Sequence, residues 1–177
     1  MHPKKALEMR NNETLAILYR RVSTDKQNKS LQIQDAIGIE YAARVLHLEI
    51  SEAFADPDTS GSMPMLDRPD GQRLLSRLDE LTAAGIQAHV ITSMQVRLGR
   101  DILDSVTTAR RIWAGGHIPH FSCEGGAMPK TNQNEMMFNV RASFAQMELG
   151  MIRQRIKANL DFRRQSGFVV GTVSPPH

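Results

Sequence analysis

The sequence predicts an α/β fold in which a mostly parallel central sheet is flanked by helices and followed by one long C-terminal helix. Short apolar segments typical of strands alternate with segments typical of helices from residue 15 to residue 121. From residue 132 to about residue 166, nothing except Gly150 would interrupt a helix. A chain of 177 residues is long enough for one such domain with a substantial core.

The first predicted strand begins at Leu15 and runs directly into the motif Tyr-x-Arg-x-Ser. Ser30 can cap the helix that follows, and Leu48–Phe54 reads as the second strand. The apolar and aromatic side chains of that helix are Leu31, Ile33, Ala36, Ile37 and Tyr41.

Asp56–Leu66 is rich in Asp, Pro, Ser and Gly, which predicts a long loop. A helix then opens at Arg68-Pro69 and ends at Gly85. Ile86–Thr92 is predicted to be a strand, and we expect a helix over Asp101–Ala114 and a further strand over Ile118–Phe121. The first of these helices places four leucines on one side: Leu74, Leu75, Leu78 and Leu81.

The last helix is predicted to begin at Asn132, which forms a capping pair with Glu135 three residues later. Its apolar residues follow a 3-4-3-4 spacing, which is typical of a seam between helices. The stripe could dock on its own sheet, but the length of the helix favours projection and self-association. The residues of this proposed oligomer interface are Met137, Val140, Phe144, Met147 and Met151.

Composition excludes several classes of protein. The single cysteine, Cys123, excludes an internal disulfide framework and suits a reducing compartment. No apolar run approaches the length that spans a bilayer, and the N-terminus lacks the apolar core of a secretory signal. From residue 131 onward, six basic residues stand against three acidic ones, so this helix could lie near phosphates. On charge alone, a solvated helix face is the simpler interpretation.

The chemistry is expected where the first strand ends. Side chains alternate between the faces of a strand, so Tyr19, Arg21 and Ser23 should point the same way. A serine hydroxyl beside a guanidinium is suited to attack on a phosphate, because the arginine stabilises the developing charge. In parallel sheets the functional crevice lies beyond the carboxyl ends of the strands, which also places the 56–68 and 94–100 loops there.

Four arginines lie in or beside this crevice, and several arginines together can stabilise a pentacoordinate phosphate without a metal. Arg97 and Arg100 are three residues apart, so a helical turn would put them on one side. Any one of these loop arginines could equally form a surface salt bridge. The four are Arg21, Arg68, Arg97 and Arg100.

Other candidate sites are weaker. His117, His120 and Cys123 have a spacing that suggests metal ligands, but the two histidines would face opposite sides of a strand and no fourth ligand is nearby. Trp113 is expected in the core. A nucleotide-binding domain of flavodoxin type is also disfavoured, because no glycine-rich phosphate loop follows the first strand.

The order of these motifs resembles the catalytic domain of the serine recombinases, the resolvase/invertase group that includes the large serine integrases. The resemblance spans roughly residues 15–172. It rests on Tyr19-Arg-Arg-Val-Ser-Thr-Asp-Lys-Gln27, Ser30-Leu-Gln-Ile-Gln34, Asp56, Thr59-Ser-Gly61, Asp67-Arg-Pro69, Arg97-Leu-Gly-Arg-Asp101, Phe144-Ala-Gln-Met-Glu148, Arg155, Gly167 and Gly171.

The resemblance implies that Ser23 attacks the backbone of double-stranded DNA and forms a 5′-phosphoserine link without a metal or other cofactor. It assigns phosphate binding to the four arginines, with Arg155 as a further candidate. Supporting positions in the active site would be Tyr19, Gln27, Gln34, Asp56 and Glu148. It also implies a homodimer, a tetramer in synapsis, and a cytoplasmic location with nucleoid association.

The same resemblance divides the chain into four parts. Residues 1–14 would be a flexible N-terminus, 15–130 the catalytic core, and 131–166 the dimerisation helix. Residues 167–177 resemble a linker that leads to a DNA-binding domain.

Two residues depart from the family pattern. Val96 replaces an acidic residue before the first arginine of Arg-x-x-Arg, and Leu149 replaces an arginine after the helix glutamate. Losing one charge of each sign could preserve the charge balance of the site. Alternatively, the chain is a catalytically weakened relative that regulates or competes with an active recombinase through dimerisation or DNA binding.

Overall fold

The fold is a five-stranded sheet in the order β2-β1-β3-β4-β5, with all strands parallel except β5. The computed structural model of the chain describes residues 14–22, 27–57, 59 and 63–165. The predicted α/β class is confirmed, and only the two-residue antiparallel strand β5 was not expected. The strands are β1 (Thr14–Arg21), β2 (Ile50–Asp56), β3 (Gln87–Thr92), β4 (Ile118–Phe121) and β5 (Gly126–Ala127).

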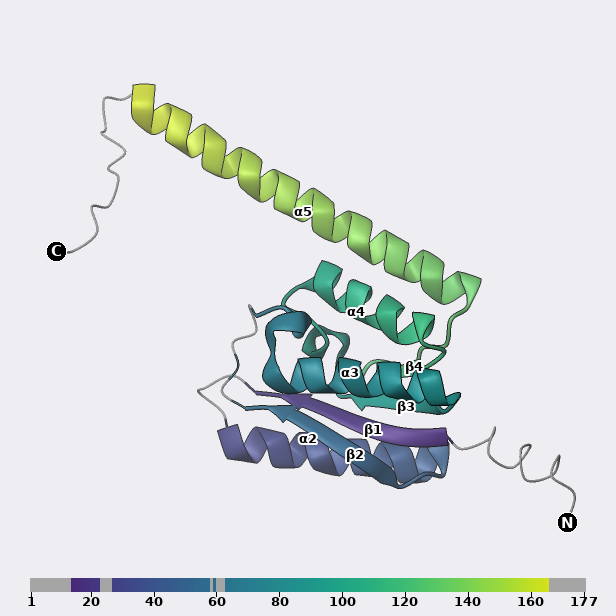
Figure 1. Cartoon of the computed structure of the whole chain (residues 1–177). Coiled ribbons are helices and arrows are strands. Elements are labelled where there is room, and N and C mark those ends of the chain that lie inside the picture. Colours follow the sequence, from purple (N-terminus) through teal and green to yellow (C-terminus); the bar gives the residue numbers. More distant parts are fainter. Residues whose placement is uncertain (1–13, 23–26, 58, 60–62, 166–177) are drawn as a thin grey trace, which may run out of the picture.

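Helices cover both faces of the sheet, with α2 on one side and α3 and α4 on the other (Figure 1). The core is correspondingly double, since Ile17 packs on the α3 side of β1 while Ala16 and Leu18 pack on the α2 side. The helices are α2 (Gln27–Tyr41), α3 (Pro69–Ala84), α4 (Ile102–Ala114) and α5 (Asn132–Gln165). Shorter turns are the π-helical η2 (Ala42–Leu46) and the 3-10 turns η3 (Met65–Asp67) and η4 (Gln95–Arg97).

Local signals fix the ends of the two helices that flank the candidate site. Pro69 is the first residue of α3, and Gly85 ends it in a left-handed conformation with φ of 71° that favours glycine. Asp101 caps α4, because its carboxylate accepts a hydrogen bond from the backbone N–H of Asp104 at 2.9 Å. The predicted end of α3 at Gly85 is therefore confirmed, and α4 begins one residue after the predicted Asp101.

Two predicted helix starts were wrong. Helix α2 begins at Gln27, so Ser30 lies inside the helix and cannot be its cap. The cap of α5 is Thr131 instead of Asn132, because the Thr131 hydroxyl accepts the N–H of Asn134 at 3.2 Å. Its carbonyl also accepts the N–H of Glu135 at 2.9 Å. The second strand begins two residues later than predicted and continues to Asp56.

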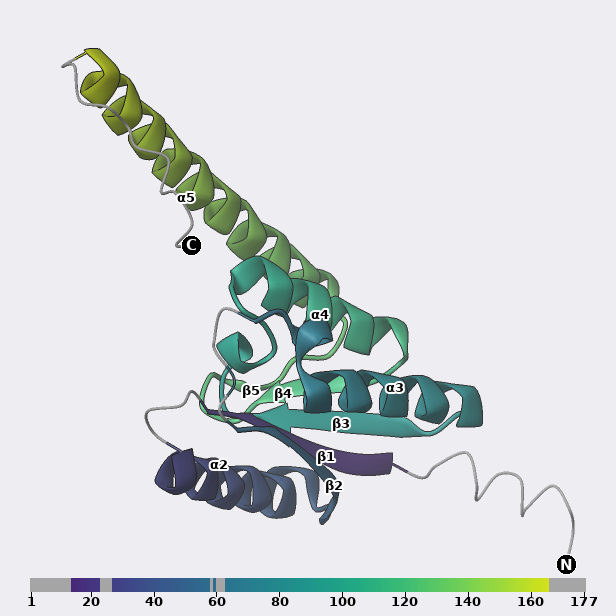
Figure 2. The same ribbon diagram turned by 60° about the vertical axis from the view of Figure 1, so that its left-hand side comes forward.

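Helix α5 lies against the body up to about Ile152 and then projects away from the sheet (Figures 1 and 2). The ring of Phe138 is fully buried and stacks on Trp113, which is in the core as predicted, with ring centroids 4.8 Å apart. The five residues of the predicted stripe are all exposed, between 37% and 65%. The stripe therefore does not dock on the sheet of its own chain.

The described helices include none long and apolar enough to cross a membrane.

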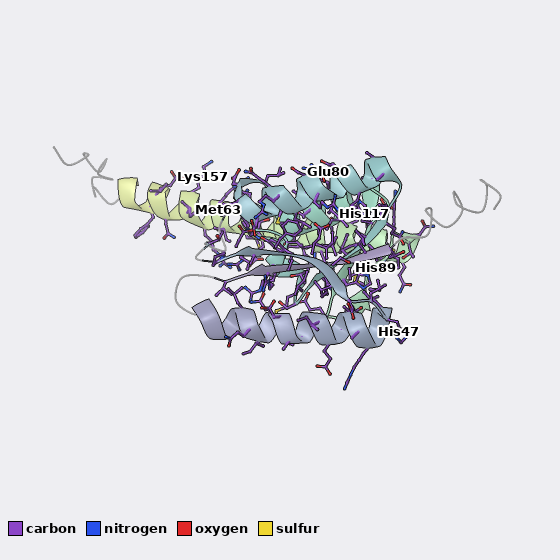
Figure 3. All side chains as sticks on the ribbon, turned by 60° about the horizontal axis from the view of Figure 1, so that its bottom comes forward. His47, Met63, Glu80, His89, His117 and Lys157 are labelled. Carbon is purple, nitrogen blue, oxygen red and sulfur yellow. The ribbon has the colours of Figure 1, made fainter. Side chains whose placement is uncertain are left out.

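A buried histidine pair lies on the α2 side of the sheet. His89 and His120 are joined by a 2.7 Å contact between their ring nitrogens, and the Tyr41 hydroxyl lies 3.1 Å from the other nitrogen of His120. His117 lies on the opposite, α3 side, where it contacts the backbone of Ala88 and Leu78, and Figure 3 shows it across the sheet from His89. The two histidines of the sequence motif thus face opposite ways, as predicted.

Acidification is expected to destabilise the fold through this pair. Burial, with the nearby His89 second, lowers the pKa of His120 from its ordinary 6.5 to about 4, and burial also lowers the pKa of His89. Between these pH values the unfolded chain binds more protons than the folded chain. The contribution of this pair to stability is therefore fully present above pH 6.5 and falls as the pH drops toward 4. We expect a loss of about 2 kcal/mol between pH 7 and pH 5, measured by urea unfolding. A His120→Phe variant with an undiminished pH slope would contradict this assignment.

Candidate active site

The candidate site lies at the carboxyl ends of the parallel strands β1, β2 and β3 (Figure 2). Tyr19 and Arg21 come from the end of β1 and point to the α3 side, as their alternation predicts. Arg20 points to the opposite side, where it pairs with Asp35 of α2. Asp56 is the last residue of β2, and η4 follows β3.

Asp56 joins the sheet to the start of α3. Its carboxylate accepts the Tyr19 hydroxyl at 2.8 Å and the backbone N–H groups of Asp70 and Gly71 at 2.9 and 3.0 Å. A negative charge is favourable there, because the first N–H groups of a helix lack partners and carry partial positive charge. Asp70 returns the contact, since its carboxylate accepts the N–H of Ala55 at 2.9 Å. These four bonds fix α3 against the end of β2.

Arg68, the residue before α3, has a fully buried side chain. Its Nη1 donates to the Tyr19 hydroxyl at 3.2 Å and to the carbonyl of Arg97 at 2.6 Å, and its Nε donates to the carbonyl of Met63 at 3.0 Å. Tyr19 therefore donates to Asp56 and accepts from Arg68. Burial raises the pKa of Tyr19, so the hydroxyl keeps the proton it donates.

Three guanidinium groups converge here, and some of their N–H groups have no hydrogen-bond acceptor. Arg21 is buried and donates to the carbonyl of Thr59 at 3.0 Å. Burial lowers the pKa of Arg21, and the positive charges of Arg97 and Arg68 lower it further. Each of these three arginines has one buried nitrogen without a hydrogen-bond partner among the described residues: Arg21 Nε, Arg68 Nη2 and Arg97 Nε. Unpaired buried donors are costly, so this arrangement suits an anion bound from outside the chain.

The loop that carries Arg97 and Arg100 packs tightly on the start of α4. A Cβ at Gly99 would lie 2.3 Å from the backbone nitrogen of Ser105, so glycine is needed between the two arginines. The Asp104 carboxylate accepts the backbone N–H of Arg100 at 2.9 Å and that of Met65 at 3.1 Å. Asp104 thus joins the loop before Arg68 to the loop that carries Arg100.

Arg100 is placed differently from the prediction. It does not share a helical turn with Arg97, because η4 ends at Arg97 and the backbone N–H of Arg100 is bonded to the Asp104 side chain. Its guanidinium is exposed and pairs with Asp101 at 3.1 Å. The described contacts therefore bring together Arg21, Arg68 and Arg97, with Arg100 at the surface of the same loop.

The remaining predicted residues are only partly described. Gln34 on α2 is buried and donates to the carbonyl of Arg21 at 3.4 Å, which is a long contact. Ser23 lies outside the described residues, and so does the side chain of Gln27. Glu148 and Arg155 are exposed on α5.

The two departures from the family pattern lie in one place. Val96 and Leu149 line the same hollow of about 290 Å³ between the arginine loop and α5, together with Ile102 and Ile152. Asp101 and Glu148 also line this hollow. No group of three or more His, Cys, Asp or Glu side chains that could hold a metal ion is found among the described residues.

Sequence reasoning missed the residues that hold this site together. Asp70 and Asp104 bond to backbone N–H groups of segments 15 and 39 residues away along the chain. Asp70 follows the predicted Pro69 helix start, and Asp104 lies three residues after the Asp101 cap. An acid in the first turn of each helix was therefore a visible signal, although its partner was not.

Comparison with known proteins gives a consistent result. The family model "Resolvase, N terminal domain" matches residues 16–169. No curated protein matches the chain. Solved structures with a similar fold include the N-terminal catalytic domain of TP901-1 integrase, with 19% identity and a TM-score of 0.61 over 78% of this chain and 98% of that one.

Two further structures share the fold. A resolvase family site-specific recombinase from Streptococcus pneumoniae is 20% identical, with a TM-score of 0.63 over 86% of this chain and 99% of that one. The C-terminal catalytic domain of ISC1926 TnpA, an IS607-like serine recombinase, is 19% identical, with a TM-score of 0.51 over 82% and 98%.

Removing the Tyr19 hydroxyl should destabilise the fold. In Tyr19→Phe, Asp56 and Arg68 each lose one buried hydrogen bond, so we expect a loss of about 1–2 kcal/mol in the free energy of unfolding. Urea unfolding measures the loss, and Tyr41→Phe is the control because its hydroxyl is only partly buried and lies outside this site. An equal or smaller loss in Tyr19→Phe than in the control would show that the hydroxyl is not a central contact.

Adding a methyl group at Gly99 should be more harmful than adding one at Gly150. Gly99→Ala forces the arginine loop away from Ser105, which we expect to cost about 2 kcal/mol or more. Gly150 lies inside α5 with nothing within 4 Å of the added Cβ, so Gly150→Ala should be neutral or stabilising by up to about 1 kcal/mol. Thermal unfolding of both variants checks this, and similar effects at the two positions would refute the close approach at Gly99.

Proposed function

The chain belongs to the resolvase N-terminal domain family, and on this premise we propose that it is the catalytic domain of a site-specific DNA recombinase. It would cleave and rejoin double-stranded DNA through a 5′-phosphoserine intermediate formed on Ser23. The observation that carries this proposal is the group of three guanidiniums, Arg21, Arg68 and Arg97, each with a buried unpaired nitrogen, at the end of β1. Position 23 follows the described part of that strand by two residues.

In the proposed reaction, the Ser23 oxygen attacks the phosphorus of a backbone phosphodiester. A bond forms between phosphorus and the serine oxygen, the bond to the 3′ oxygen breaks, and the serine proton leaves as the 3′ oxygen gains one. Rejoining is the reverse, with a 3′ hydroxyl attacking the phosphoserine. One phosphodiester replaces another, so the exchange requires neither a cofactor nor an energy source.

The arginines would have different roles in the reaction, because they differ in burial and in their contacts. Arg68 is held by the Tyr19 hydroxyl and the Arg97 carbonyl, and Arg21 by burial and the Thr59 carbonyl. With Arg97 on the adjacent turn, these arginines would bind the non-bridging oxygens, whose charge grows in the transition state. Arg100 is exposed, so it would close on the phosphate as DNA arrives. The positioning residues would be Tyr19, Gln34 and Asp56, with Gln27 and Glu148 proposed as further members of the site.

Oligomerisation is proposed for α5. Its exposed stripe and its projection from the body leave apolar side chains in water, which favours contact with a second copy. We propose a homodimer that pairs into a tetramer in synapsis, with Arg155 near the DNA backbone. In this reading residues 15–130 form the catalytic core, 131–166 the dimerisation helix and 167–177 the linker to a DNA-binding domain. Such a protein would act in the cytoplasm, at the nucleoid.

The alternative is a weakened relative that acts only by dimerisation or DNA binding, and Val96 and Leu149 are the residues in its favour. Both line one largely apolar hollow with Ile102 and Ile152, and neither adds a charge to it. The buried arginine group is intact beside it. These two observations support the active enzyme over the binding-only alternative.

The direct test is a search for the covalent intermediate. The chain is fused to a DNA-binding module and given DNA with paired sites, and denaturing gels report a protein–DNA adduct. We expect an adduct that is absent in Ser23→Ala. A fusion that folds and occupies its sites without forming an adduct would favour the binding-only alternative.

Truncating an arginine should abolish cleavage without unfolding the chain. In Arg97→Ala, the backbone carbonyl that Arg68 contacts remains. In Arg100→Ala, the side chain that is removed is exposed. Both variants should therefore keep their unfolding midpoints. We expect cleavage to fall at least 100-fold in each, because a transition-state contact is lost. Arg153→Ala, an exposed arginine on α5, is the matched control. Normal cleavage by either variant would argue strongly against phosphate binding by these arginines.

A further inference from the structure

We infer that Arg141 and Gln95 are positioning residues. They couple the docking of α5 to the geometry of the arginine group, which consists of Arg21, Arg68 and Arg97. This inference rests on the proposed function, because it assigns a means of control to that same site. It follows from where α5 contacts the body and from what the contacted turn holds in place.

Three side-chain contacts attach the start of α5 to the body. Phe138 stacks on Trp113 of α4, and Asn139 accepts a hydrogen bond from Arg110, also on α4. The third contact differs, because Arg141 donates to the side-chain oxygen of Gln95, the first residue of η4. Of these three contacts, only the last reaches the turn that carries Arg97.

Gln95 is well placed to transmit a displacement. It is only 4% exposed, and its backbone N–H donates to the Glu124 carboxylate at 2.7 Å. Its carbonyl accepts the N–H of Leu98 at 3.0 Å, which closes the turn. The backbone of Gln95 is thus fixed in the turn, and its buried side chain has little room to follow Arg141 alone, so a displacement of Arg141 would act on the turn.

The last residue of this turn, Arg97, contacts the side chain of Arg68. The carbonyl of Arg97 accepts Nη1 of Arg68 at 2.6 Å, and Arg68 in turn contacts Tyr19. Arg97 Nε is buried without a partner in the described part of the chain, so that nitrogen does not anchor its own side chain. The turn therefore sets the position of Arg97 and one acceptor of Arg68.

The rest of α5 acts as a lever on this contact. Beyond Ala145 its described side chains are exposed up to Asn159, and the helix projects from the body (Figure 2). A partner that binds the projecting part and rotates or shifts α5 would change the pull of Arg141 on Gln95. Such a displacement would thereby alter the spacing of Arg97 and Arg68 without any contact between the partner and these two arginines.

The test uses the 177-residue chain labelled with ¹⁵N at arginine. NMR reports the order and chemical shift of the Arg97 and Arg68 side-chain N–H groups, first alone and then with inorganic phosphate as the probe. In Arg141→Ala we expect Arg97 to lose order and phosphate binding to weaken about fivefold, close to 1 kcal/mol. Arg141→Lys, which restores a donor, should recover both.

Arg110→Ala is the matched control, since it removes an α4–α5 hydrogen bond without touching the turn. Unchanged order at Arg97 in Arg141→Ala, or an equal loss in the control, would overturn the coupling. A response of wild-type Arg21, Arg68 and Arg97 to phosphate is a separate readout. Its absence would count against the proposed function, while the order of Arg97 without phosphate would still decide the coupling.

Discussion

The burial of the Arg68 guanidinium is the constraint on which the rest of the site depends. A fully buried positive charge must be surrounded by acceptors, and the chain supplies the Tyr19 hydroxyl and the carbonyls of Met63 and Arg97. The negative charge of Asp56 reaches Arg68 through the Tyr19 hydroxyl, and its carboxylate also holds the first turn of α3. One charge thus fixes the ends of β1 and β2, the start of α3 and the turn after β3.

This arrangement explains how the site can be both rigid and reactive. The hydrogen bonds satisfy only part of each guanidinium, and burial, with the charges of Arg97 and Arg68 second, lowers the pKa of Arg21. A site in which donors are fixed before the anion arrives pays little reorganisation when charge develops on a phosphate. The same rigidity means that a small movement of η4 changes several contacts at once.

Much of the fold could be predicted because its signals are local. Alternating strands and helices imply a parallel sheet, Gly85 and Asp101 mark helix ends, and alternation along β1 places Tyr19 and Arg21 on one face. The start of α5 was misplaced because Thr131 and Asn132 are adjacent residues that can both cap a helix. β5 was missed because two residues are too short for any periodicity.

The interior contacts of the site could not be predicted, since they join segments that are distant in sequence. Nothing in the pattern shows that Asp104 would accept the N–H of Met65, or that Arg141 would reach Gln95. The seam prediction likewise found the exposed stripe of α5 but not Phe138, the residue that actually docks, because docking depends on where Trp113 lies. Periodicity identifies a face, and only the fold decides which residue on the helix is covered.

The most direct test of this account is the crystal structure of the chain with tungstate, a tetrahedral mimic of phosphate whose position anomalous diffraction reveals. We predict one ion within hydrogen-bond distance of the Arg21, Arg68 and Arg97 guanidiniums, with the Tyr19–Asp56–Arg68 contacts unchanged. Tungstate bound only at other basic residues, with these three guanidiniums turned toward other protein groups, would contradict the claim that these arginines form a phosphate site.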